Sequence, residues 1–121
     1  MLRILGGVND VVTAGERRSL PLVTDDLVEL SDATLDFLKA LASPARQKIM
    51  LLFARGAELS VGEIAELADI GQSTASEQLK LLRRGGIVTS RRDGKTVYYR
   101  ADKDGMARAL DDLQNYLKVC C

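Results

Sequence analysis

The stretch from residue 60 to residue 100 constrains the fold of this chain more than any other feature. Ser60 followed three residues later by Glu63 is a capping-box signature, and it predicts the start of a short helix. The Asp-Ile-Gly sequence that ends at Gly71 predicts a tight turn, because glycine supplies a permissive backbone there. Residues 72–84 then carry apolar side chains at helical spacing. A helix, a turn and a second helix in this order predict a helix-turn-helix unit.

The second of these helices has two different faces. Ala75, Leu79 and Leu82 share one side at about 100° per residue, and the small Ala75 allows close approach to the preceding helix. The opposite side carries Ser73, Ser76, Glu77, Lys80 and Arg84. A polar face with small residues at its N-terminal end suits insertion into the major groove of DNA. An ordinary surface helix is the alternative, and the turn before it and the hairpin after it favour DNA binding.

A basic β-hairpin is predicted directly after this helix. Gly85-Gly86 ends the helix, residues 87–91 and 96–100 alternate as strands, and Asp93-Gly94 between them is a two-residue turn signal. Residues 80–100 include seven basic residues and one acid, a net charge of +6, although the whole chain has 17 basic and 17 acidic residues. Charge concentrated in this way is typical of a surface that contacts nucleic-acid phosphates. The combination predicts a winged helix-turn-helix.

The rest of the chain predicts one domain with an N-terminal arm. Residues 1–30 contain glycines and a proline that interrupt any long period, so we expect an arm that is partly structured or flexible. Residues 31–121 are expected to form the winged-helix DNA-binding and dimerisation domain. Two helices are predicted before residue 60, the second starting at Ser43-Pro44. The first begins at Ser31 or Asp32 and has the apolar positions Leu35, Leu38 and Leu41.

The last predicted helix carries an apolar stripe. It begins at Asp102, and its stripe consists of Met106, Leu110, Leu113 and Leu117. This stripe can either close the core of the chain itself or pair with a second copy. A DNA-binding domain of this size favours the second, because palindromic half-sites require a two-fold dimer.

The chain has no histidine, and its only two cysteines are the adjacent Cys120 and Cys121. Without histidine, neither a Ser/His nor a Cys/His constellation can form, so no enzyme activity and no catalytic residue is predicted. Two adjacent cysteines do not make a disulfide framework, and no apolar run is long enough for a membrane span or a signal peptide. We therefore expect a cytoplasmic protein with no membrane partner.

Three segments of the chain resemble the ArsR/SmtB family of bacterial metal- and metalloid-responsive repressors. LASPAR at residues 41–46 resembles the family's AL-x-x-P-x-R signature, QSTAS at residues 72–76 resembles its S-x-x-S-x-H-L region, and residues 79–88 lead into the wing in the same way. The resemblance extends from about Leu35 to the C-terminus. It implies a mainly α fold with a small β-hairpin, in the order α-α-α-α-β-β-α, that dimerises through its terminal helices. It also implies a repressor that occupies double-stranded operator DNA and is released by an inducer.

The chain also departs from the family pattern. The family's Cys-x-Cys metal box would fall near Ser60 and Gly62, and neither is a thiol. The interfacial zinc, nickel and cobalt sites of some members use Asp and His pairs, which a chain without histidine cannot supply. Glu77-Gln78 stands where the family has histidine in the recognition helix. Glutamate accepts from cytosine N4 but repels phosphate, so operator preference should differ from that of relatives.

Two sets of site residues follow from these patterns. The residues predicted to contact DNA are Gln72, Ser73, Thr74, Ser76, Gln78, Lys80, Arg84, Arg91, Arg92 and Lys95. The predicted metal ligands are Cys120 and Cys121. DNA binding itself is expected to require no cofactor.

The cysteine pair predicts the kind of signal that would control DNA binding. Two thiolates select soft centres such as As(III), Sb(III) or another thiophilic metal ion. Some arsenic-sensing relatives carry a third cysteine beyond such a pair, and here the third donor would have to come from elsewhere, for example from a partner copy. A thiol-based redox or sulfane-sulfur switch is the alternative input. A different class of function is also possible from the sequence: a winged helix that binds other proteins and does not bind DNA.

Overall fold

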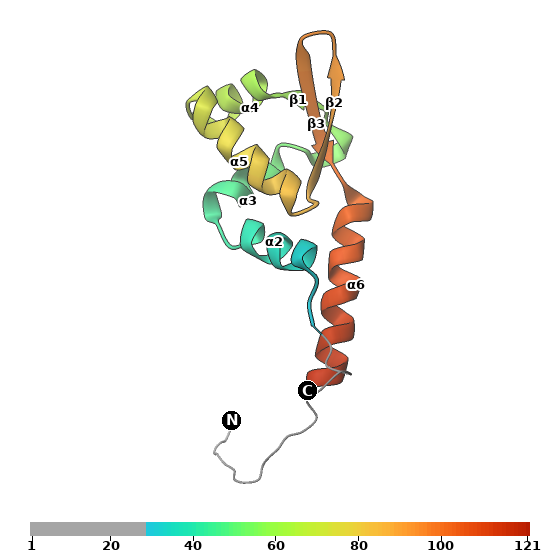
Figure 1. The fold of residues 1–121 in the computed structure, drawn as a ribbon. Helices are drawn as coiled ribbons and strands as arrows, with labels where there is room; N and C mark the ends of the chain where they lie inside the picture. The colour runs from blue at the N-terminus through green and yellow to red at the C-terminus, as the bar shows by residue number, and fades with distance from the viewer. Residues whose placement is uncertain (1–28) are drawn as a thin grey trace.

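The computed structural model describes residues 29–121, so the arm expected over residues 1–30 lies almost wholly outside the described residues. Residues 29–121 form five α-helices, one 3-10 turn and a three-stranded sheet (Figure 1). Their order is α2 (Asp32–Leu41), α3 (Pro44–Leu51), the 3-10 turn η2 (Ala54–Gly56), β1 (Leu59–Ser60), α4 (Val61–Ala68), α5 (Gln72–Arg84), β2 (Val88–Asp93), β3 (Thr96–Ala101) and α6 (Lys103–Cys120). The predicted winged helix-turn-helix is confirmed. No helix of residues 29–121 has the length and apolar character needed to cross a membrane.

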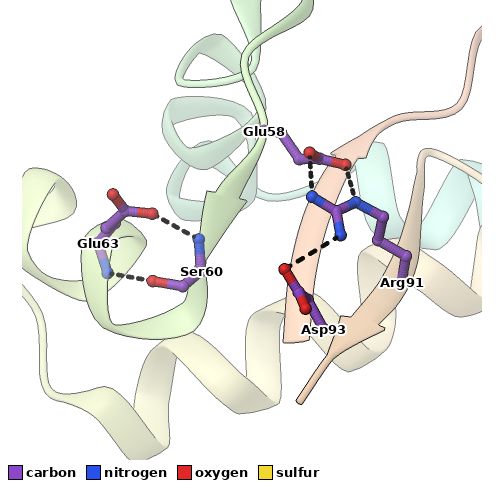
Figure 2. A network of polar contacts seen from close by, with 5 residues as sticks. All are labelled: Glu58, Ser60, Glu63, Arg91 and Asp93. Atoms are coloured by element: carbon purple, nitrogen blue, oxygen red, sulfur yellow. Dashed lines mark hydrogen bonds and ion pairs between the residues drawn. The ribbon is translucent and has the colours of Figure 1, made fainter. Parts of the chain in front are cut away.

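Side-chain caps fix where the helices begin. In the predicted capping box, the Ser60 backbone N–H donates to Glu63 Oε1 at 2.8 Å, and the Glu63 N–H donates to Ser60 Oγ at 3.2 Å (Figure 2). Ser43 caps α3 in the same manner, ahead of the proline at its first turn. At the start of α6, the Gly105 N–H donates to Asp102 Oδ1 at 3.0 Å. These caps satisfy N–H groups that have no partner within their own helix.

The core lies where α4 and α5 meet α3 and the base of the hairpin. Its largest fully buried apolar side chains are Ile49, Ile64, Leu79, Leu82, Ile87 and Val88. The leucines predicted for α2 are not its buried face: Thr34, Phe37 and Ala40 are buried, whereas Leu35 is 40% exposed and Leu38 and Leu41 are half-buried. The helix is rotated from the prediction because Phe37 and Ala40 pack into the core and the Thr34 hydroxyl hydrogen-bonds to Asp112 of α6.

The turn between α4 and α5 depends on a different residue from the one predicted. Gly71 has an ordinary extended backbone, with φ −68° and ψ 155°. Asp69 instead ends α4 in the left-handed conformation, with φ 57° and ψ 50°. Aspartate tolerates this region better than most residues do, because its short polar side chain can bond locally. The chain therefore reverses at the end of α4 rather than at the glycine.

The sheet differs from the predicted hairpin in two ways. Its order is β1-β3-β2, and the short strand β1 pairs with β3 through Leu59 opposite Tyr99. This third strand was not predicted. The turn also lies one residue later than expected, since Asp93 pairs with Thr96 and leaves Gly94-Lys95 as the two-residue loop. Gly94 has φ 64°, so the glycine takes the loop position that needs a positive φ.

Candidate nucleic-acid interface

Helix α5 presents a fully polar outer face. Its inner residues Ala75, Leu79 and Leu82 are each 0% exposed, so the rotation of the helix about its axis is fixed by the core. The exposed residues are Gln72, Ser73, Thr74, Ser76, Glu77, Lys80, Arg83 and Arg84. Six of the predicted DNA contacts are therefore exposed to solvent. In Figure 1 the hairpin tip lies towards the same end of the molecule as the N-terminal end of α5.

Gln78, a seventh predicted contact on α5, is used inside the chain. It is half-buried, and its Oε1 accepts a hydrogen bond from Arg46 Nη1 at 3.0 Å. Arg46 also donates from Nε to the Ala40 carbonyl and from Nη2 to the Lys39 carbonyl, both at 2.9 Å. Arg46 thus joins the last carbonyls of α2 to the middle of α5. This role of Arg46 was not predicted, because its partners lie on other helices, although Arg46 closes the LASPAR segment.

The hairpin separates into a free tip and a braced base. Arg92 and Lys95 are exposed near the tip. Arg91 instead donates from Nε and Nη2 to the two carboxylate oxygens of Glu58, at 2.8 Å each (Figure 2). Its guanidinium also lies 5.0 Å from the ring centre of Tyr98 and 4.0 Å from Asp93 Oδ2. This bidentate pair connects β2 to the segment before β1, so Arg91 braces the wing rather than presenting a free charge.

The same pair perturbs both ionisable groups. The hydrogen bond from Arg91 lowers the pKa of Glu58, and the hydrogen bond to Glu58 raises the pKa of Arg91. Each shift favours the charged form that the other partner needs. No local pattern points to Glu58, because its partner Arg91 lies 33 residues further along the chain.

Helices α2 and α6 are joined by a carboxylate. Asp112 Oδ2 accepts from the Thr34 hydroxyl at 2.7 Å, and from the backbone N–H and hydroxyl of Ser31 at 3.1 and 3.2 Å. The hydrogen bond from Thr34 is the main reason that the pKa of Asp112 is lowered. This contact fixes the start of α2 against the middle of α6. The remaining apolar face of α6 stays open: Leu110 is 55% exposed and Leu117 is 51% exposed.

The sequence of this chain is similar to those of known transcriptional repressors. A family model described as a helix-turn-helix domain matches residues 41–91. The chain is 46% identical over 76 residues to a biofilm growth-associated repressor of Agrobacterium fabrum, a match covering 63% of this chain and 64%, just under two thirds, of that protein. It is 34% identical over 92 residues to a biofilm growth-associated repressor of Xylella fastidiosa, covering 76% of this chain and 80% of that protein.

Solved structures share both the fold and the sequence pattern. One is a homodimeric winged helix-turn-helix DNA-binding domain from Mycobacterium bovis, described as a possible ArsR-family transcriptional regulator. It is 34% identical with a TM-score of 0.57, and the match covers 72% of this chain and 80% of that one. Another is described as a possible transcriptional regulator for arsenical resistance, at 32% identity and a TM-score of 0.57, covering 67% and 83%. The chain belongs to the ArsR/SmtB family.

The one thiol site of this ArsR/SmtB protein lies at the end of α6. Cys120 is the last residue of the helix, Cys121 follows it, and both are exposed. The two sulfurs are disulfide-bonded to each other. Within residues 29–121 no three His, Cys, Asp or Glu side chains come together as a metal site. Once reduced, the pair would offer two sulfur donors, and the described part of the chain places no third ligand beside them.

Proposed function

We propose that this protein is a homodimeric transcriptional repressor that binds double-stranded operator DNA through α5 and the wing. The observation that carries the proposal is the outer face of α5, polar and exposed over its whole length above a core-fixed inner face. Small side chains such as Ser73 and Ser76 let the helix enter the major groove, and Lys80 and Arg84 supply positive charge beside it. Arg92 and Lys95 at the wing add positive charge for neighbouring phosphates.

The dimer follows from the open face of α6. Leu110 and Leu117, which share one side of this helix, are each more than half exposed, and Leu35 of α2 is 40% exposed. Single exposed leucines are ordinary, but a stripe of them along an 18-residue helix needs a partner surface. The Mycobacterium bovis relative is described as homodimeric. A two-fold pair through α6 would present two copies of α5 to the two half-sites of a palindrome.

DNA binding is tested by equilibrium titration of the full chain with duplex DNA at several salt concentrations. The logarithm of the binding constant is expected to fall steeply with the logarithm of salt, because bound cations are released from the phosphates. Lys80→Ala should weaken binding on all sequences and reduce the salt slope by about 1. Lys118→Ala, an exposed lysine in the last turn of α6, is the matched control and should leave the slope unchanged. A flat salt dependence for the wild type would contradict the proposal.

We propose that a thiophilic inducer releases the repressor from its operator by binding at Cys120 and Cys121. The inducer would be As(III), Sb(III) or another soft metal ion. Sulfur donors select such centres over hard cations, and binding requires that a cellular thiol reductant first reduce the disulfide to two thiols, which then lose their protons to bind the ion. One solved relative is described as a possible regulator for arsenical resistance. The third ligand would come from the partner copy or from a small molecule. Because the pair ends the helix proposed as the dimer seam, an ion held there would change how the two copies are oriented.

The inducer is tested on the double variant Cys120→Ser, Cys121→Ser. It should bind operator DNA as the wild type does and fail to release it when arsenite, antimonite, Cd(II) or Hg(II) is added. A coupling of roughly 5–150-fold in DNA affinity is typical of such linkage, so release by the wild type should fall in this range. Release of the double variant by the same ions would remove the cysteine pair from the mechanism.

A redox switch is the second candidate, and the bond between the two sulfurs favours it. In this case the reduced dithiol and the oxidised disulfide would differ in operator affinity without any metal. DNA titrations of the reduced and oxidised protein, each in the presence of a metal chelator, separate the two inputs. A difference that survives chelation supports the redox switch, and equal affinities support the metal-type inducer.

A further inference from the structure

Glu77 occupies the outermost position of α5. At about 100° per residue it lies roughly 200° around the helix from Ala75, which is 0% exposed. It is one turn after Ser73, and Lys80 follows it three residues later. The side chain is exposed, and within residues 29–121 it forms no ion pair and no side-chain hydrogen bond. The one carboxylate on this face thus projects at its centre, and no side chain of residues 29–121 holds it there.

The chemistry of the major groove limits what this carboxylate can meet. A carboxylate only accepts hydrogen bonds, and it repels phosphate. The groove offers two kinds of donor, the N4 amino group of cytosine and the N6 amino group of adenine. Adenine also places its N7 acceptor beside that donor, which disfavours a second acceptor there. Guanine and thymine show acceptors or a methyl group, so cytosine is the base that fits best.

We infer that Glu77 is a specificity-determining residue that selects cytosine at one position of each operator half-site. The inference rests on the proposed function, because it needs α5 in the major groove. It goes further by naming the base that this surface reads. An unpaired carboxylate that enters the groove loses its water, and only a donor such as cytosine N4 replaces those hydrogen bonds. Half-sites without cytosine at that position should therefore bind about tenfold more weakly.

The experiment is selection of binding sites from random duplexes by the full chain, followed by sequencing of the bound pool. Four proteins are compared: wild type, Glu77→Gln, Glu77→Ala and Glu66→Gln. Glu66 is an exposed glutamate on the neighbouring helix α4, so its substitution removes one negative charge without touching α5. Any effect of net charge alone should then appear equally in Glu66→Gln.

The wild type should enrich cytosine at one position in each half-site, and Glu66→Gln should enrich the same sequence. Glu77→Gln should move the preference at that position to adenine, because glutamine pairs with adenine N6 and N7. Glu77→Ala should bind without preference at that position and keep the rest of the sequence. Identical selected sequences for wild type and Glu77→Gln would overturn the inference while leaving the proposed function intact. If none of the four proteins selects any sequence, both the inference and the proposed function are overturned.

Discussion

Helices α5 and α6 are both amphipathic, yet the described part of the chain covers the apolar face of α5 and leaves part of that of α6 open. The inner face of α5 is closed within the chain, with Ala75, Leu79 and Leu82 each 0% exposed. The stripe on α6 has the same helical spacing, but Leu110 and Leu117 are 55% and 51% exposed. Hydrophobic periodicity therefore predicts that a face will be covered and does not say by which chain. This difference separates the residues that hold the domain together from those proposed to join two domains.

The largest expected effect is on the closed face. Leu79→Ala should lower the free energy of unfolding by about 2–5 kcal/mol at every protein concentration, because it leaves a cavity in the core. Leu117→Ala, the same change on the open face of α6, should alter mainly the dependence of stability on protein concentration. Denaturant unfolding at several concentrations makes the comparison. Equal losses for the two variants at low concentration would erase the distinction between the faces.

The next effect is on association. The double variant Leu110→Gln, Leu117→Gln should weaken the proposed dimer by about 2–3 kcal/mol, roughly 100-fold, because four half-exposed leucines per dimer lose their apolar cover. Sedimentation equilibrium measures the change. Leu67→Gln on α4 is the matched control, since Leu67 is 60% exposed but lies off α6. A dimer that Leu67→Gln weakens more than the α6 double variant would place the interface elsewhere.

A third change tests how α6 is joined to α5. A methyl group on Gly105 would collide with the Gly86 carbonyl oxygen and lie 2.7 Å from Asp102 Oδ2. Gly105→Ala should therefore cost about 1–3 kcal/mol of stability by overpacking. It should also weaken DNA binding, because the turn after α5 must shift. Ala107→Ser, at an exposed position of the same helix, serves as control and should change neither thermal unfolding nor DNA affinity.

The sequence predicts those elements of the fold that depend on residues close together in the chain, and it misses those that depend on distant residues. The bounds of α5, its buried face and the Ser60–Glu63 cap were all predicted, because each depends on residues within a few positions of one another. Strand β1 was missed because it is two residues long and exists only through its pairing with β3. The buried face of α2 was missed for a similar reason, since Thr34 turns inward to bond Asp112, 78 residues away.

In the candidate site too, the features that depend on neighbouring residues were predicted, and those that depend on distant residues were not. The exposed residues of α5 follow from helical spacing and lie where the sequence placed them. The tasks of Gln78 and Arg91 within the chain depend on Arg46 and Glu58, which are distant in sequence. A count of basic residues therefore overstates the free positive charge of the wing. The role of the cysteine pair stays a prediction.

The smallest expected effect concerns pH. Hydrogen bonds from Thr34 and Ser31 lower the pKa of Asp112 in the folded chain, so this carboxylate stabilises the fold above its usual pKa range. That contribution is lost as the pH falls through the lowered value. Asp112→Asn should therefore be less stable than the wild type near neutral pH, with a difference that shrinks in acid. Thermal unfolding from neutral pH down to below the usual pKa of an aspartate measures the difference in stability between the two proteins. Asp111→Asn, at an exposed position, is the control. A difference that stays constant with pH would show that the ionisation of Asp112 does not contribute to stability.

The most direct test of the central claim is an amide chemical-shift map of the full chain titrated with an operator duplex. If α5 enters the major groove, the largest shifts should fall on residues 72–80 of α5 and on Gly94 and Lys95 at the wing tip. Residues 110–119 of α6 should shift little on addition of DNA. Shifts concentrated on α6, with the outer face of α5 unchanged, would show that α5 is not the DNA-binding helix.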